Sequence, residues 1–147
     1  MSENKYNAAL NALLIDLNGS LLQYVGDAWP WSDASAQRER NELDVLIGRQ
    51  REQIVRLTEL LEGRGWTIEF GTYPTEYTDL HYVALDYLLS QLVENEEQLI
   101  SEIERTINDC AGDPQAGAVL IQLLAEQREI VRGLEESTKS RSVGHTA

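Results

Sequence analysis

Apolar residues recur every three or four positions along four stretches of the chain, a spacing that places them on one face of an α-helix. In the first stretch, Leu10, Leu14, Leu17 and Leu21 form such a face. The predicted helices cover about residues 4–28, 32–62 (beginning between 32 and 35), 77–110 and 114–136. The pattern therefore predicts an all-α chain built from four amphipathic helices.

Proline and glycine mark the predicted helix ends. Pro30 disfavours a helical conformation in the residue before it and so ends the first helix. Gly63 or Gly65 can supply the left-handed cap of the second helix, and Asp113 followed by Pro114 is a strong start signal for the fourth. Short turns join the first helix to the second and the third to the fourth, which predicts two antiparallel hairpins.

The segment between the second and third helices, about residues 63–76, is too long for a simple turn. Trp66, Ile68 and Phe70 alternate with polar residues, a pattern typical of an extended stretch with one face on the bundle. About 15 extended residues reach about 50 Å, and a helix of about 30 residues is about 45 Å long. The sequence therefore predicts a crossover that runs back along the whole bundle and joins the two hairpins.

Aromatic residues gather on this crossover and at the start of the third helix. They could line a pocket under the crossover, or serve as satellite core or a dimer contact. These residues are Trp66, Phe70, Tyr73, Tyr77, Tyr82 and Tyr87.

Glutamine stands at two positions where the helical period calls for leucine. Gln50 and Gln127 lie on the apolar stripes of the second and fourth helices, and each begins the tripeptide Gln-Arg-Glu. Residues equally far from a hairpin turn lie at one level, which brings Leu17 level with Gln50 and Glu96 level with Gln127. The predicted central layer contains Leu17, Gln50, Gln53, Glu96, Gln127 and Ile130.

From about residue 5 to residue 136 the chain resembles, in topology and register, the ferritin-like di-iron carboxylate superfamily. Those bundles carry one inward glutamate on the first and third helices and a Glu-x-x-His motif on the second and fourth. The corresponding positions here read Leu17, Glu96, Gln50-Arg51-Glu52-Gln53 and Gln127-Arg128-Glu129-Ile130. Only Glu96 keeps the expected type, and His81 and His145 lie away from the layer. The resemblance implies a ferritin-like four-helix bundle, and the substitutions imply a degenerate member without the metal ligands and without a metal cofactor.

A neutral amide brings no negative charge to a metal, so we expect the glutamines to form a structural layer of hydrogen bonds. No catalytic, cofactor-binding or metal-ligating residues are predicted. The leading interpretation is a non-enzymatic, metal-free domain that acts through protein–protein contact or homo-oligomerisation, for example as a homodimer. One alternative is a metal-binding oxidase or iron-handling protein that uses the displaced carboxylates Glu52, Glu94, Glu96 and Glu129. Another is a sensor that binds a small molecule in the former metal cavity.

Composition narrows the choice of partners and compartment. The 147 residues suffice for one domain, placed at residues 1–136 and followed by a mobile tail at 137–147. The net charge of −13 argues against nucleic acid as a partner. No apolar run is long enough to span a membrane and no secretory signal is visible, so a cytoplasmic protein is expected. Cys110, the single cysteine, is expected to be a buried residue near a helix end.

Overall fold

The computed structural model describes residues 2–29, 36–82 and 84–146, and the side chains of residues 4–29, 36–79 and 84–140 within them. Its helical elements are α1 (Ser2–Asn18), α2 (Leu21–Asp27), α3 (Gln37–Gly63), the 3₁₀ helix η2 (Thr75–Tyr82), α4 (Leu85–Asp109) and α5 (Pro114–Thr146). The described residues contain no β-strand, so the all-α prediction is confirmed for them. Among the same residues, no helix has the length and apolar character needed to cross a membrane. The expected start of the second helix at residues 32–35 lies outside the described part of the chain.

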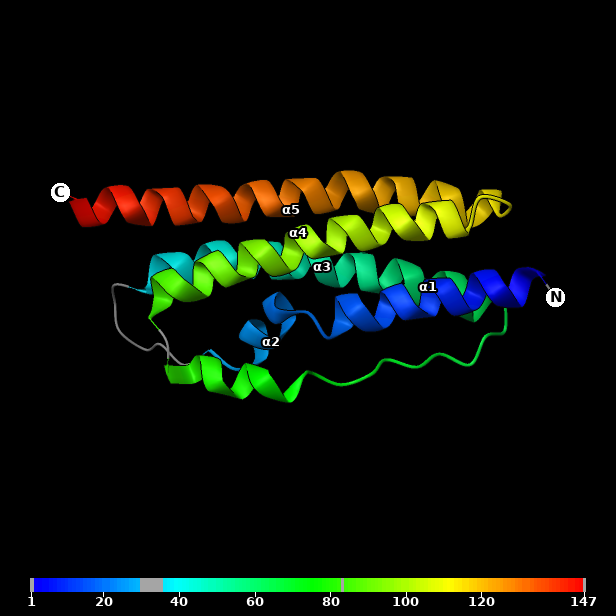
Figure 1. The fold of residues 1–147 in the computed structure, drawn as a ribbon, viewed down its shortest axis with the longest axis horizontal. Helices are drawn as coiled ribbons and strands as arrows, with labels where there is room; N and C mark the ends of the chain where they lie inside the picture. Colours follow the sequence, from blue (N-terminus) through cyan, green and yellow to red (C-terminus); the bar gives the residue numbers. More distant parts are fainter. Residues whose placement is uncertain (1, 30–35, 83, 147) are drawn as a thin grey trace.

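The helices form an elongated bundle (Figure 1). α1 packs against α3, α3 against α5, α5 against α4 and α4 against α1, so each long helix has two long neighbours. α1 begins and α5 ends at opposite ends of the bundle (Figure 1). Residues 64–74 run from the end of α3 along α1 to η2, and so return to the end of the bundle at which α4 begins (Figure 1).

The first predicted helix is divided in two. α1 ends and α2 begins around Gly19 and Ser20, so the prediction of one helix through residue 28 is wrong. Ser20 caps α2, because its backbone is extended and its hydroxyl accepts a hydrogen bond from the Gln23 amide at 3.3 Å. A Cβ atom on Gly19 would lie 3.2 Å from the Thr72 carbonyl oxygen, so glycine also lets the connection between α3 and η2 pass close to the break.

Asparagine side chains of α1 hold this connection in place. Asn11 donates to the Glu69 carbonyl oxygen at 2.9 Å and accepts from the Glu69 amide at 3.0 Å, as a neighbouring β-strand would. Its Oδ1 atom also accepts from the Trp66 indole at 3.2 Å, and Asn18 donates to the Phe70 carbonyl oxygen at 3.1 Å. The extended residues therefore have specific polar partners on α1.

The third predicted helix begins later than expected. Tyr77, its predicted first residue, belongs to η2, and α4 begins only at Leu85 after an extended Ala84. The reason lies in the apolar pattern, because the stripe that packs into the core starts with Leu85 and Leu88.

α5 continues beyond the predicted helix end at residue 136. Its backbone is helical to Thr146, and the hydroxyl of Ser137, which is only 3% exposed, donates to Glu42 of α3. Residues after 136 therefore prolong α5, and the mobility of segment 137–147 stays a prediction.

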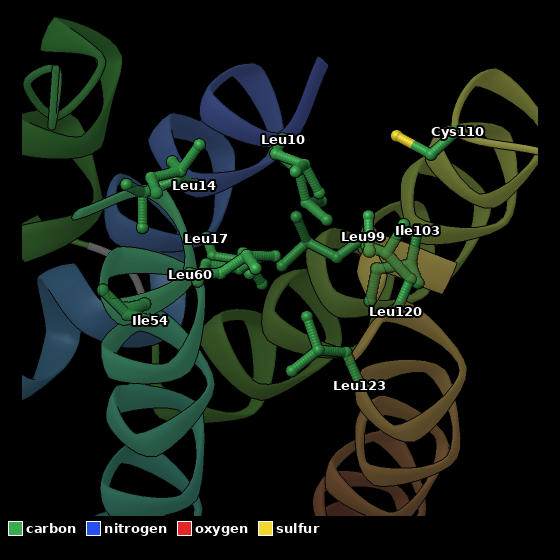
Figure 2. Close-up of a cluster of buried hydrophobic side chains, with 14 residues drawn as sticks. Leu10, Leu14, Leu17, Ile54, Leu60, Leu99, Ile103, Cys110, Leu120 and Leu123 are labelled. Atoms are coloured by element: carbon green, nitrogen blue, oxygen red, sulfur yellow. The ribbon is translucent and has the colours of Figure 1, made fainter. Parts of the chain in front are cut away.

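The apolar core is divided into two clusters. The first, drawn in Figure 2, takes residues from all four long helices, among them Leu17, Ile54, Ile103 and Leu123. The second includes Leu21, Ile47, Leu92 and Ile130. α3, α4 and α5 contribute to both clusters, whereas α1 packs in the first and α2 in the second. The polar side chains between the clusters form the candidate site.

Candidate functional site

Six polar residues lie on the helices between the two apolar clusters, and we call them the polar layer. They are Ser20 and Gln23 at the start of α2, Gln50 and Gln53 on α3, Glu96 on α4 and Gln127 on α5. None is more than 4% exposed. Burying this many polar groups costs free energy unless they bond to one another, so their hydrogen bonds determine what the layer can do.

Glu96 lies at the centre of these hydrogen bonds. Its Oε1 atom accepts from Gln50 Nε2 at 2.6 Å and from Gln127 Nε2 at 3.3 Å. Gln127 Nε2 also donates to the Glu96 carbonyl oxygen at 3.1 Å. One carboxylate oxygen is thus shared by two neutral amides from two other helices.

The oxygen of Gln50 is equally occupied. It accepts from the Ser20 hydroxyl at 2.8 Å and from Gln23 Nε2 at 3.0 Å. Gln23 Nε2 also donates to the Ile47 carbonyl oxygen at 3.2 Å. The break between α1 and α2 therefore contributes two hydrogen-bond partners that a continuous helix would not bring to this level.

A guanidinium group at the edge of the bundle sets the direction of these bonds. Arg51 Nε donates to Gln23 Oε1 at 3.2 Å, and arginine can only donate. Gln23 must then present its nitrogen to Gln50, and Gln50 must present its nitrogen to Glu96. The chain Arg51–Gln23–Gln50–Glu96 therefore runs one way, and it requires Glu96 Oε1 to act as an acceptor.

The structure brings together only part of the predicted layer. Gln50, Glu96 and Gln127 are in direct contact, and Gln53 donates to the Leu123 carbonyl oxygen of α5 at 3.2 Å. Leu17 and Ile130 belong to the apolar clusters on either side.

Ser20 and Gln23 were missed by the prediction, because it extended one helix through both residues. The sequence Asn18-Gly19-Ser20 carried the signal, since a glycine followed by a capping residue marks a helix boundary.

Burial controls the charge of Glu96. Removal from water raises the pKa of this carboxyl group to about 8, although the hydrogen bonds from Gln127 and Gln50 act in the opposite direction. Glu96 is therefore mainly a neutral carboxylic acid at pH 7.

Two divalent ions of the kind that the superfamily binds do not fit this layer. Such a pair requires several carboxylates to cancel its charge and imidazoles to complete its coordination. The polar layer supplies one carboxyl group, and one of its two oxygens, Oε1, already accepts hydrogen bonds from the amide nitrogens of Gln50 and Gln127. Among the described residues, no group of three or more His, Cys, Asp or Glu side chains could hold a metal ion.

The displaced carboxylates do not supply the missing metal ligands. Glu52, Glu94 and Glu129 are exposed, whereas Glu96 is buried. Glu129 accepts from Arg132 on its own helix at 2.9 Å, and Glu94 accepts from Gln91 at 3.4 Å. They lie on outward faces of three helices and do not converge on Glu96.

Two cavities lie under the crossover. The larger, about 660 Å³, opens between η2 and α4 and is lined by residues that include Leu21, Tyr77 and Glu94. The smaller, about 170 Å³, shares Tyr77 with it and reaches Asp16. The Tyr77 ring packs on Tyr24 with 5.5 Å between ring centroids.

The other crossover aromatics occupy different places. Tyr24 also packs edge-on against Tyr73 at 5.2 Å, and Trp66 lies against the first apolar cluster. Phe70 and Tyr87 are exposed, at 44% and 51%. The side chain of Tyr82 lies outside the described residues.

The family model described as a ferritin-like domain matches residues 7–140, which includes all the residues of the polar layer. No curated protein and no solved structure matches the chain at a significant level.

Proposed function

The chain belongs to the ferritin-like domain family, and from this premise we propose that it is a non-enzymatic, metal-free member that acts through protein–protein contact, as a homo-oligomer. The observation that carries the proposal is the polar layer. Its only carboxyl group, Glu96, already accepts hydrogen bonds from two neutral amides and is mainly uncharged at pH 7 because its pKa is about 8.

The proposal includes the connectivity that is typical of the family. In it, α1 and α2 form one antiparallel hairpin with α3, and α4 and α5 form the second. Residues 64–74 together with η2 are the crossover. The packing of α1 on α3 and of α4 on α5 supports this connectivity. So does the path of residues 64–74 along α1 (Figure 1).

A polar layer of this kind suits a scaffold better than a catalyst. It fixes the relative levels of the helices, because each donor must meet its acceptor, much as a buried polar residue fixes the register of a coiled coil. The fold then remains defined without a metal. We therefore expect the outer surface of the bundle to make the functional contacts.

Apolar side chains on the outer surface are candidate contact points for a second copy. Val45 and Val55 of α3 are 56% and 52% exposed, and Ile121 of α5 is 62% exposed. Burying these side chains against a partner would remove them from water, which favours association.

Sedimentation velocity over a range of protein concentrations tests the proposed self-association. The proposal expects a concentration-dependent oligomer that is weakened in a Val45→Asn, Val55→Asn variant. A Glu52→Asn variant, which changes an exposed residue of the same helix, is the matched control and should associate as the wild type does. A monomer at all concentrations would contradict homo-oligomerisation.

Iron oxidation tests the non-enzymatic part of the proposal. Ferrous iron in air-saturated buffer should disappear at the same rate with and without the protein. A protein-dependent rate that is lost in Glu96→Gln would favour the iron-handling alternative.

A second candidate function rests on the larger cavity. Its volume of about 660 Å³ lies within the range of about 300–1,000 Å³ that is typical of small-molecule sites. It would place a ligand under the crossover, against Tyr77, and not in the bundle centre. A ligand that raises the melting temperature of the wild type but not of Tyr77→Ala would support a sensor function.

A further inference from the structure

Three buried oxygen atoms in the polar layer have no hydrogen-bond partner. They are Glu96 Oε2, Gln53 Oε1 and Gln127 Oε1, and each belongs to a side chain that is 0% exposed. An acceptor left unpaired in a protein interior costs roughly 1–3 kcal/mol, so three in one place require an explanation.

The three atoms belong to neighbouring side chains. Gln127 and Glu96 are joined directly, with 3.3 Å between Gln127 Nε2 and Glu96 Oε1. Gln53 bonds to the carbonyl oxygen of Leu123, which lies one helical turn before Gln127 on α5. Side chains from α3, α4 and α5 thus place three unpaired acceptors within about one helical turn of one another along the bundle.

Rotation of the amide groups cannot satisfy these atoms. If Gln127 turned over, its oxygen would face the two Glu96 oxygens to which its nitrogen now donates. If Gln53 turned over, its oxygen would face the Leu123 carbonyl oxygen. The directed hydrogen bonds from Arg51 through Gln23 and Gln50 also require Glu96 Oε1 to be an acceptor. No turn of an amide group can therefore supply the hydrogen-bond donors that the three oxygens lack.

We propose that a single buried water molecule lies between Gln53, Glu96 and Gln127 and donates its two hydrogens to the oxygens of the two glutamines. The third unpaired atom, Glu96 Oε2, carries the proton of the carboxylic acid and donates it to the water oxygen. One water molecule and one carboxylic-acid proton therefore give each of the three oxygen atoms a hydrogen-bond partner. A water with three such partners is typical of buried waters in proteins.

The charge of Glu96 supports this arrangement. Burial raises the pKa of its carboxyl group to about 8, so the hydrogen that Glu96 donates to the water oxygen is present at neutral pH. No charged side chain is needed in the layer. The inference rests on the metal-free layer of the proposed function, because a metal ion would occupy the same oxygens.

A crystal structure of the wild-type protein at atomic resolution gives the first test. We expect one density peak within about 3.2 Å of Gln53 Oε1, Gln127 Oε1 and Glu96 Oε2. Elemental analysis of the same protein distinguishes the outcomes. An empty space at this position would overturn the water but leave the metal-free function standing, whereas a bound metal would overturn both.

Magnetic relaxation dispersion of ¹⁷O water, which counts waters with long residence times, gives the second test in solution. A Gln53→Leu, Gln127→Leu variant should lose about one long-lived water relative to the wild type. The matched control is Gln98→Leu, Gln122→Leu, which removes two exposed glutamines and should leave the count unchanged. An equal count in wild type and layer variant, with both folded by circular dichroism, would overturn the proposal.

Discussion

Glu96 lies fully buried in the centre of the bundle, with one carboxyl oxygen bound to two amides. A buried carboxyl group of this kind makes the stability of the fold depend on pH. In the folded chain it stays protonated at pH values at which it is ionised in the unfolded chain. Sequence reasoning placed Glu96 in the layer from helix register alone. Its protonation could not be predicted, because that depends on complete removal from water and on the direction of the surrounding amides.

The first prediction concerns the pH dependence of stability. The carboxyl pKa of Glu96 is about 8 in the folded protein against 4.5 for an ordinary glutamate. The unfolded state binds fewer protons between these values, so Glu96 lowers the free energy of unfolding as pH rises through this window, by at most about 1.4 kcal/mol per pH unit. Glu96→Gln removes this contribution.

Urea unfolding of both proteins from about pH 5 to about pH 9.5 measures the effect. The stability of Glu96→Gln relative to the wild type should increase with pH across this range, and the difference should level off above the folded-state pKa. Other carboxylates titrate in both proteins and cancel in the comparison. A difference that stays constant would mean that Glu96 is ionised in the folded state.

Individual helices followed the apolar pattern wherever it was continuous. The pattern gave the middle of each helix, but it missed the break at Gly19 and Ser20. A stripe of leucines continues across the break from Leu17 to Leu21, so periodicity alone could not reveal it. The signal for the break lay in local residues, because Gly19 is followed by the capping residue Ser20, and the connection between α3 and η2 passes close to it.

A pair of glycine substitutions tests how tightly this connection lies on α1. Gly71 and Gly65 both have left-handed backbones, with φ of 73° and 71°. A Cβ atom on Gly71 would meet Ile15 Cγ2 at 2.7 Å, whereas one on Gly65 would meet nothing within 4 Å. Gly65→Ala should cost about 1 kcal/mol from backbone strain alone, and Gly71→Ala should cost about 1–3 kcal/mol more.

Thermal and urea unfolding of the two variants measure this difference. Since both substitutions require the same backbone conformation, Gly65→Ala is the control for strain. Equal losses of stability would show that the connection can move away from α1 at little cost.

Polar contacts between helices lie at one end of the bundle and at its centre. At the end of α3, Arg64 makes two bonds to Asp113 at the start of α5, at 2.7 and 2.9 Å, and a third to Asn7 of α1 at 2.9 Å. At the centre, the polar layer joins α2, α3, α4 and α5. The signal for the end contact was present in the sequence, because Asp113 was predicted as a helix cap, but its partner Arg64 depends on the way the helices assemble.

Breaking the end contact should destabilise the whole bundle. The side chains of Arg64 and Asp113 are only 8% and 9% exposed, and the bond to Arg64 is the main cause that lowers the pKa of Asp113. Asp113→Ala should therefore cost about 3–5 kcal/mol, because it leaves the guanidinium group without its carboxylate.

Glu104→Ala is the matched control for Asp113→Ala. Its partner Arg128 lies at 3.7 Å, both side chains are more than half exposed, and such surface pairs contribute about 0–1 kcal/mol. Urea unfolding measures both variants. A loss of less than about 1 kcal/mol for Asp113→Ala would show that Arg64 finds other partners.

The central claim is that the polar layer holds its hydrogen bonds in place of a metal. Elemental analysis of untagged protein, purified natively and measured before and after incubation with ferrous iron, tests it most directly. The account predicts less than about a tenth of a metal atom per chain. About one or two tightly bound ions per chain, lost in Glu96→Gln, would contradict it.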